Sequence, residues 1–132
     1  MLFKYSINSH RREELIDITH YVKECVKKSK IEKGIAVLFV PHTTAGVTIN
    51  ENADPSVQKD ITTFLSQKVP KSNNYSHLEG NADSHIKSSL IGPSISLIIE
   101  EGNLILGTWQ GVYFYEFDGP RNRNLLIKIL EG

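Results

Sequence analysis

Three histidines of this chain lie in polar segments where their side chains could bind a metal ion. His42 follows an apolar run, and His77 and His85 flank an acidic, glycine-containing stretch. Three imidazole ligands would leave a fourth position on a zinc ion open for water or substrate. Glu51, which follows the next strand, could be a further ligand or a proton acceptor. The spacing matches no local zinc motif, so a second interpretation stays open, in which His42 only hydrogen-bonds to backbone and the other histidines face solvent.

Two arginines near the end of the chain suit the binding of a phosphate or diphosphate. The turn at residues 118–120 precedes Arg121 and Arg123, which point the same way if this loop is extended. Planar guanidinium groups bind phosphate oxygens bidentately. The alternative is that these arginines form salt bridges with Glu116 or Asp118.

Further polar residues could line the same cleft. The hydroxyls of Thr43 and Thr44 would bind phosphate, and Lys87 would add a cation. The candidate catalytic residues are Glu51, Lys87 and Gln110. Gln110 follows Trp109, the only tryptophan, which we expect in the core or in a subunit interface rather than under a ligand. The remaining histidines, His10 and His20, are expected at the surface.

The elements that must position these residues follow from the hydrophobic pattern. Alternating or continuous apolar runs predict strands at residues 2–8, 35–40, 47–49, 94–99, 104–106, 109–117 and 125–130. Helical spacing predicts helices at residues 17–29, 54–69 and 82–90. Short connections favour antiparallel pairing. The expected fold is one α+β domain over residues 1–132, with mostly antiparallel, sandwich-like sheets and two or three flanking helices.

The same pattern gives expectations about packing. The continuous apolar run 35–40 predicts a strand that is covered on both faces. The second helix, capped by Asp54, is expected to face the core with an apolar stripe made of Val57, Ile61, Phe64 and Leu65. Cys25 lies on the apolar stripe of the first helix, where a small buried hydrophobe is favoured over a reactive thiol.

Composition excludes several classes of protein. The 132 residues carry 15 Lys and Arg against 15 Asp and Glu, so the formal net charge is zero. A protein that grips nucleic acid or an anionic membrane needs surplus positive charge, so neither partner is expected. One cysteine cannot form an intrachain disulfide, which favours a reducing cytoplasm. No apolar run is long enough to span a membrane, and the first residues do not resemble a signal peptide.

Several segments, read in order, resemble the YjbQ-like family, also called the secondary thiamine-phosphate synthase family. The resemblance rests on matching motifs along nearly the whole chain: residues 41–45 (PHTTA), 48–55 (TINENADP), 77–81 (HLEGN), 85–94 (HIKSSLIGPS), 107–111 (GTWQG) and 116–121 (EFDGPR).

The resemblance implies a homotrimer with a polar cleft near the subunit interface. It also implies that His42, His77 and His85, with Glu51, are the site residues and that they hold a divalent metal ion, zinc or magnesium. The implied activity is a weak thiamine-phosphate synthase reaction, which joins hydroxymethylpyrimidine diphosphate to a thiazole phosphate and releases pyrophosphate. Alternatives are a trimer that binds metal or a small phosphorylated metabolite with only incidental activity, or a purely structural trimer. The acidic segment before His85 is shorter than in some relatives, which leaves the role of Asp83 open.

Overall fold

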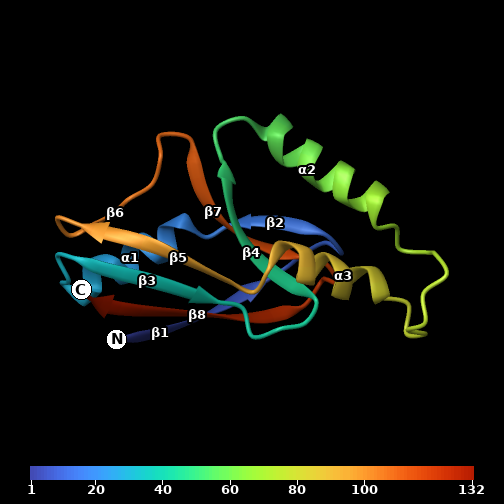
Figure 1. Ribbon diagram of the computed structural model, residues 1–132, viewed down its shortest axis with the longest axis horizontal. Coiled ribbons are helices and arrows are strands. Elements are labelled where there is room, and N and C mark those ends of the chain that lie inside the picture. Colours follow the sequence, from blue (N-terminus) through green and yellow to red (C-terminus); the bar gives the residue numbers. More distant parts are fainter.

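Two antiparallel sheets and three helices build the chain, as the computed structural model of all 132 residues shows (Figure 1). The first sheet has the strand order β1 (Leu2–Asn8), β8 (Asn122–Glu131), β3 (Gly34–Phe39), β5 (Ser94–Glu100) and β6 (Asn103–Leu104). The second has the order β2 (Glu14–Asp17), β7 (Gln110–Glu116) and β4 (Ala45–Glu51). The helices are α1 (Thr19–Ser29), α2 (Pro55–Lys68) and α3 (Ala82–Ile91). This architecture confirms the expected α+β fold.

The core lies between one face of the five-stranded sheet and a layer formed by α1 and the three-stranded sheet. Alternate residues of β3, β5 and β8 point into it, as period-two strands require. Helix α1 contributes Val22, Cys25 and Val26, which follow each other at helical spacing. Cys25 is therefore buried as expected, and burial raises the pKa of its thiol.

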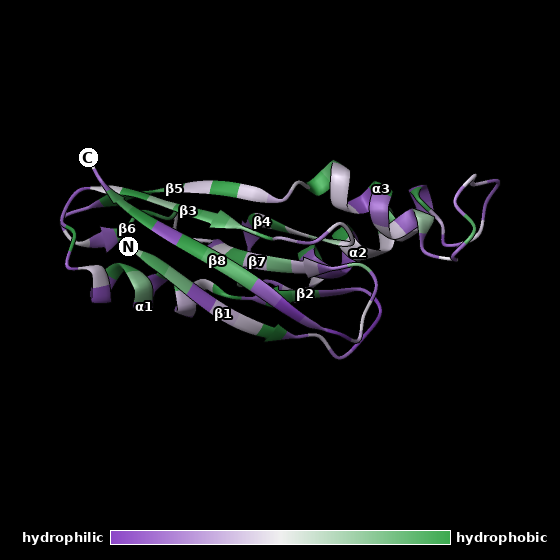
Figure 2. Cartoon of the chain, turned by 90° about the horizontal axis from the view of Figure 1, so that it is seen from below, coloured by the Kyte–Doolittle hydropathy of each residue, from purple (hydrophilic) through white to green (hydrophobic).

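The opposite face of the five-stranded sheet is uncovered, so the expectation that β3 is buried on both faces was wrong. Ile35 and Phe39 are 45% and 43% exposed. Strand register places Ile35 between Ile98 and Leu130, so apolar side chains form a row across neighbouring strands. Figure 2 shows green hydrophobic segments along these strands. An alternating strand can be buried on both faces only if a second layer lies outside it, and one chain supplies no such layer.

Helix α2 begins where the sequence predicts, but its apolar stripe does not reach the core. The Asp54 carboxylate accepts a hydrogen bond from the Ser56 N–H at 2.9 Å and caps the helix. No residue of α2 is buried, and Phe64 is 60% exposed. In Figure 1 the helix projects from the edge of the molecule beyond β2 and β4. The prediction of a core-facing stripe was therefore wrong for the single chain, because this stripe has no partner within it.

Helix α3 packs closely on the start of β4. The Ser88 hydroxyl donates a hydrogen bond to the Ala45 carbonyl at 2.7 Å. Gly46 allows this approach, since a Cβ at that position would lie 2.8 Å from the Gly92 carbonyl oxygen. The buried face of α3 is mainly polar, which is possible only because its side chains find partners.

The short strand β2 was not predicted. Its four residues, ELID, are too few and too charged to show a clear alternation. Pairing with β7 brings the preceding charged loop, residues 10–13, next to α3. None of the three helices is long and apolar enough to cross a membrane.

Replacing Gly46 by alanine should destabilise the fold by about 1–3 kcal/mol, because the new methyl group would press on backbone that cannot move away freely. Urea unfolding of both proteins measures this difference. Gly132→Ala is the matched control, since nothing lies within 4 Å of a Cβ there. Equal stability of Gly46→Ala and wild type would contradict the close approach of α3.

Candidate functional site

Two of the three predicted histidines lie together. The rings of His77 and His85 meet edge to face, with their centroids 5.1 Å apart. Both line a cavity of about 290 Å³ together with Tyr75, Ala82 and Ile86. His77 comes from the loop before α3 and His85 from its first turn, so the helix and its entry loop form this cavity. The Glu79 carboxylate lies 4.0 Å from His77 Nε2. Two imidazoles at this separation could supply two ligands to one metal ion.

His42 belongs to a separate environment at the end of β3. Its Nε2 accepts a hydrogen bond from the backbone N–H of Asn124 in β8, at 2.9 Å. Burial lowers the pKa of His42, and the nearby Arg123 guanidinium lowers it further. An Nε2 that accepts this hydrogen bond carries no proton, so the imidazole is neutral in this arrangement. His42 therefore matches the second interpretation of the sequence, in which it forms a hydrogen bond to the backbone and binds no metal ion through Nε2.

One chain does not assemble the predicted metal site. No three His, Cys, Asp or Glu side chains converge on a point where they could hold a metal ion. His77 and His85 fit such a role as a pair, whereas the lone pair of His42 Nε2 is already engaged by Asn124. A three-histidine site is therefore not formed by the residues of a single chain in this arrangement.

The two arginines do not share a phosphate site. Arg123 is buried, and it donates to both carboxylate oxygens of Glu116 and to the hydroxyl of Thr44 at 2.7 Å. Arg121 is exposed and is bound to Asp118 at 2.9 Å. The expectation that both point the same way fails because Arg123 lies within β8 with its side chain directed inward, whereas Arg121 precedes the strand. Both arginines form the salt bridges of the alternative interpretation.

Burial alone would raise the pKa of the Glu116 carboxyl. Hydrogen bonds from Arg123, from the Asp118 N–H and from Ser9 outweigh this effect and hold the pKa below its ordinary value. Thr44 is buried in the same network, while Thr43, next to it, is exposed. Of the predicted phosphate-binding residues, Thr43 and Arg121 are therefore the two with accessible side chains.

Lys87 lies inside the protein rather than in a cleft. Only 1% of its side chain is exposed, and its ammonium group donates to Asp83 at 2.8 Å and to Glu13 at 2.5 Å. Arg12 binds both oxygens of the same Asp83 carboxylate, at 2.9 and 3.0 Å. We call these four residues, Arg12, Glu13, Asp83 and Lys87, the buried charge cluster. Because its amine is buried and paired with two carboxylates, Lys87 is not placed to act on a substrate.

The buried charge cluster was missed in the sequence, although one signal was present. Asp83 and Lys87 are four residues apart, which puts them on the same face of a helix. Burial alone would raise the pKa of Asp83, but the hydrogen bonds from Arg12 and Lys87 hold it at about 2. Arg12 and Glu13 come from a distant loop whose position depends on the unpredicted strand β2.

Glu51 and Gln110 lie together at the opposite end of the three-stranded sheet. They are directly paired across β4 and β7, whereas the other end of β4, at Ala45, pairs with Glu116. Seven residues of strand separate these ends by about 20 Å. Gln110 Oε1 accepts a hydrogen bond from the Gly107 N–H at 2.7 Å and closes the turn that carries Trp109. Of the three predicted catalytic residues, Glu51 and Gln110 are thus neighbours, whereas Lys87 lies on α3, which packs at the other end of β4.

Trp109 is 63% exposed and is not part of the core, so the subunit interface stays a prediction for it.

Near α3, Asn81 Oδ1 is the one buried side-chain polar atom without a hydrogen-bond partner. The Nδ2 of the same side chain donates to Asp118 at 2.9 Å. His10 and His20 are exposed, as expected.

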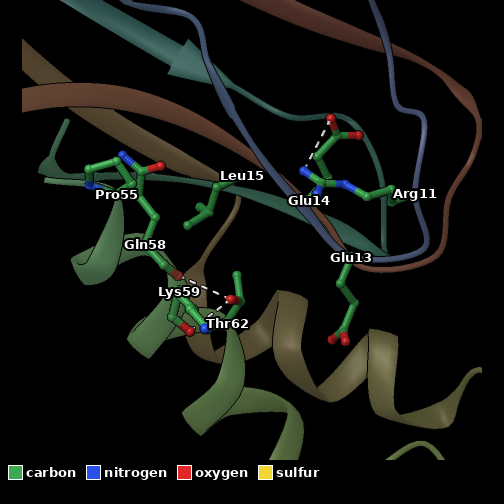
Figure 3. A pocket seen from close by; sticks show the side chains of 8 residues that line it. All are labelled: Arg11, Glu13, Glu14, Leu15, Pro55, Gln58, Lys59 and Thr62. Carbon is green, nitrogen blue, oxygen red and sulfur yellow. Dashed lines mark hydrogen bonds and ion pairs between the residues drawn. The ribbon is translucent and has the colours of Figure 1, made fainter. Parts of the chain in front are cut away.

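A second cavity, of about 280 Å³, lies between α2 and the loop that enters β2 (Figure 3). Arg11, Glu13 and Glu14 approach from the loop, and Lys59 and Thr62 approach from the helix. Arg11 is paired with Glu14 at 3.7 Å. Carboxylates and cations are mixed here, and no predicted site residue lines this cavity, so the candidate site remains the cavity of His77 and His85.

Comparison with known proteins identifies the family. The family described as UPF0047 protein YjbQ-like matches residues 3–132. The chain belongs to the YjbQ-like family. A UPF0047 protein of Methanocaldococcus jannaschii is 60% identical over 98% of this chain and 94% of its own length. The UPF0047 protein YugU of Bacillus subtilis is 48% identical over 98% of this chain and 99% of its own length.

Solved structures agree with the fold. A YjbQ/UPF0047 family protein of Clostridium acetobutylicum superposes with a TM-score of 0.95 at 53% identity, over 97% of this chain and 99% of its own. A protein of Sulfolobus solfataricus, described as of unknown function, superposes with a TM-score of 0.96 at 32% identity, over 100% and 97% of the two chains. The comparisons confirm the family and its fold, and none of these descriptions names a reaction.

In this YjbQ-like chain, Asp83→Asn should lower the free energy of unfolding by about 3–5 kcal/mol, because it removes the fully buried carboxylate that pairs with Arg12 and Lys87 and leaves only Glu13 as a counter-charge. Urea unfolding at pH 7 measures this loss. Arg121→Met is the matched control, since it removes a surface ion pair worth at most about 1 kcal/mol.

The same variant should also change the pH dependence of stability. The stabilisation from Asp83 is fully present above the ordinary carboxyl pKa of 3.8 and is lost as the pH falls towards about 2. Wild type should therefore lose stability more steeply than Asp83→Asn across this window. Parallel curves for the two proteins would contradict the role given to Asp83.

Proposed function

We propose that this protein is a YjbQ-like enzyme that handles a small phosphorylated metabolite, with a reaction of the thiamine-phosphate synthase type. The substrate pair would be hydroxymethylpyrimidine diphosphate and a thiazole phosphate, and pyrophosphate would be released. Membership of the family over residues 3–132 supports the proposal at the level of fold and motifs. The observation that carries it is the cavity of His77 and His85.

The size and lining of this cavity suit a heteroaromatic ring. Its volume is about 290 Å³, and Tyr75 and the two imidazoles offer flat faces beside Ala82 and Ile86. A departing diphosphate develops negative charge that a cation must stabilise. Because Lys87 and Arg123 are committed to internal carboxylates, Arg121 is the accessible guanidinium at this end of the chain.

A divalent metal ion, zinc or magnesium, is part of the proposal. His77 and His85 would hold it, since their rings lie together in the cavity. When bound, such an ion neutralises charge on phosphate oxygens. The chain's own residues bind and orient the substrate ring.

We further propose that the protein works as a homotrimer in the cytoplasm, without nucleic acid or membrane as a partner. Large apolar side chains with no cover in one chain support an oligomer: Ile98 on the open sheet face, Phe64 on α2, Leu90 on α3 and Trp109. The position of Glu51 and Gln110 also favours a site completed between copies, since they lie about 20 Å from the other end of β4, where the histidine-bearing helix α3 packs.

A second candidate function is a trimer that binds a phosphorylated metabolite without rapid turnover. The observation that favours it is the internal pairing of Lys87 and Arg123, two cations that a synthase could otherwise use. Calorimetry with pyrophosphate and thiamine phosphate separates the two functions, because tight binding without product formation supports the binding protein.

His85→Ala should reduce thiamine phosphate formation by about 100-fold or more, because it removes one side of the cavity and one of the two proposed metal ligands. Chromatographic detection of the product measures the rate. His20→Ala, which removes an exposed histidine on α1, should leave the rate unchanged. Equal rates for wild type and His85→Ala, or no product from either, would reject the proposed reaction.

Phe64→Asp should weaken the trimer, because it places a charge in the uncovered stripe of α2. Light scattering after size-exclusion chromatography should give the mass of three 14.9 kDa chains for wild type and a smaller mass for the variant. Lys59→Glu changes a charge on an exposed residue of the same helix, outside the stripe, and should keep the trimer. A monomeric wild type would contradict the assembly.

A further inference from the structure

The hydrogen bond at His42 determines which of its ring nitrogens carries the proton. The Asn124 backbone N–H donates to His42 Nε2 at 2.9 Å. A backbone N–H can only donate, so Nε2 must present its lone pair. In a neutral imidazole the proton then lies on Nδ1.

The other nitrogen of His42 is free to bind a ligand. No hydrogen bond is formed by Nδ1, and the only buried side-chain nitrogen or oxygen without a partner is Asn81 Oδ1. His42 Nδ1 is therefore accessible at the surface of the loop between β3 and β4. Thr43, the next residue, is exposed beside it.

The charges around His42 disfavour a second cation at this position. Arg123 lies close enough to lower the pKa of His42, and its guanidinium is buried. Glu116, the neighbouring carboxylate, is fully engaged by Arg123, Ser9 and the Asp118 N–H. A metal ion on Nδ1 would have to displace the proton that Asn124 fixes there, and a metal ion on Nε2 would have to displace Asn124 itself.

We infer that His42 is a substrate-binding residue and not a metal ligand: its neutral Nδ1–H donates a hydrogen bond to a phosphoryl oxygen of the metabolite. This inference rests on the proposed function for its ligand class. The inference gives His42 a different role from His77 and His85. Of the three histidines, only these two remain suited to binding a metal ion. An uncharged N–H can donate to a phosphoryl oxygen in a part-buried loop without a carboxylate nearby to balance a positive charge on the ring.

The first test determines the tautomer. Nitrogen-15 NMR of the histidine rings in the wild-type protein at pH 7 should show protonated Nδ1 and unprotonated Nε2 for His42. Addition of Zn²⁺ should shift the ring nitrogens of His77 or His85 and leave those of His42 unchanged. A proton on Nε2, or a zinc-induced shift of His42, would overturn the inference.

The second test uses two variants of His42: one keeps the hydrogen-bond acceptor of the imidazole, and the other keeps its donor. His42→Gln retains an acceptor that can reach the Asn124 N–H but loses the Nδ1–H donor, whereas His42→Asn retains a donor near the Nδ1 position. Calorimetry with inorganic pyrophosphate should show about tenfold weaker binding to His42→Gln, the loss expected for one hydrogen bond to a charged group. Binding to His42→Asn should lie closer to wild type.

Equal pyrophosphate binding by wild type and His42→Gln, or no binding by wild type, would overturn the substrate-binding role. Neither test requires turnover. A protein with the Nδ1–H tautomer and donor-dependent pyrophosphate binding, but without thiamine phosphate formation, would therefore retain this inference and lose the proposed reaction.

Discussion

The buried carboxylate of Asp83 is the contact on which the arrangement of the candidate site depends. It binds Arg12 from the loop before β2 and Lys87 from the next turn of its own helix. Charges removed from water are tolerated only when their partners are in place, so this cluster fixes the helix and the loop relative to each other. Glu13 extends the contact to α2 through the Ser66 hydroxyl, at 2.7 Å. Three segments distant in sequence thereby meet around the buried charge cluster.

The placement of α3 sets the geometry of the histidine pair. Its inner face carries Asp83 and Lys87, and its outer face carries His85 towards His77. His42 is held by a different element, through Asn124 of β8. The candidate site therefore has two parts with separate supports, a pair of imidazoles on α3 and a fixed neutral imidazole at the end of β3. Glu51 and Gln110 form a third group, at the end of β4 away from α3.

Much of the fold was predictable because it depends on local pattern. The Asp54 cap, the buried Cys25 and most strands follow from spacing and turn chemistry. The site was less predictable, because it depends on pairing between distant segments. No residue near Lys87 in the sequence indicates that Glu13 is its ion-pair partner. Strand alternation alone does not predict that Arg123, and not Arg121, points into the protein. The errors at β3 and α2 share one cause: their apolar residues are present as the pattern indicates, but nothing within the chain covers them.

Native-state hydrogen exchange of the α3 amides tests the central claim most directly, that the Asp83 carboxylate holds this helix in place. In wild type, the amides of residues 86–91 should exchange only when the whole domain unfolds. In Asp83→Asn, the same amides should exchange through a local opening, at lower free energy than the amides of β7. Unchanged protection of α3 relative to β7 in the variant would contradict the claim.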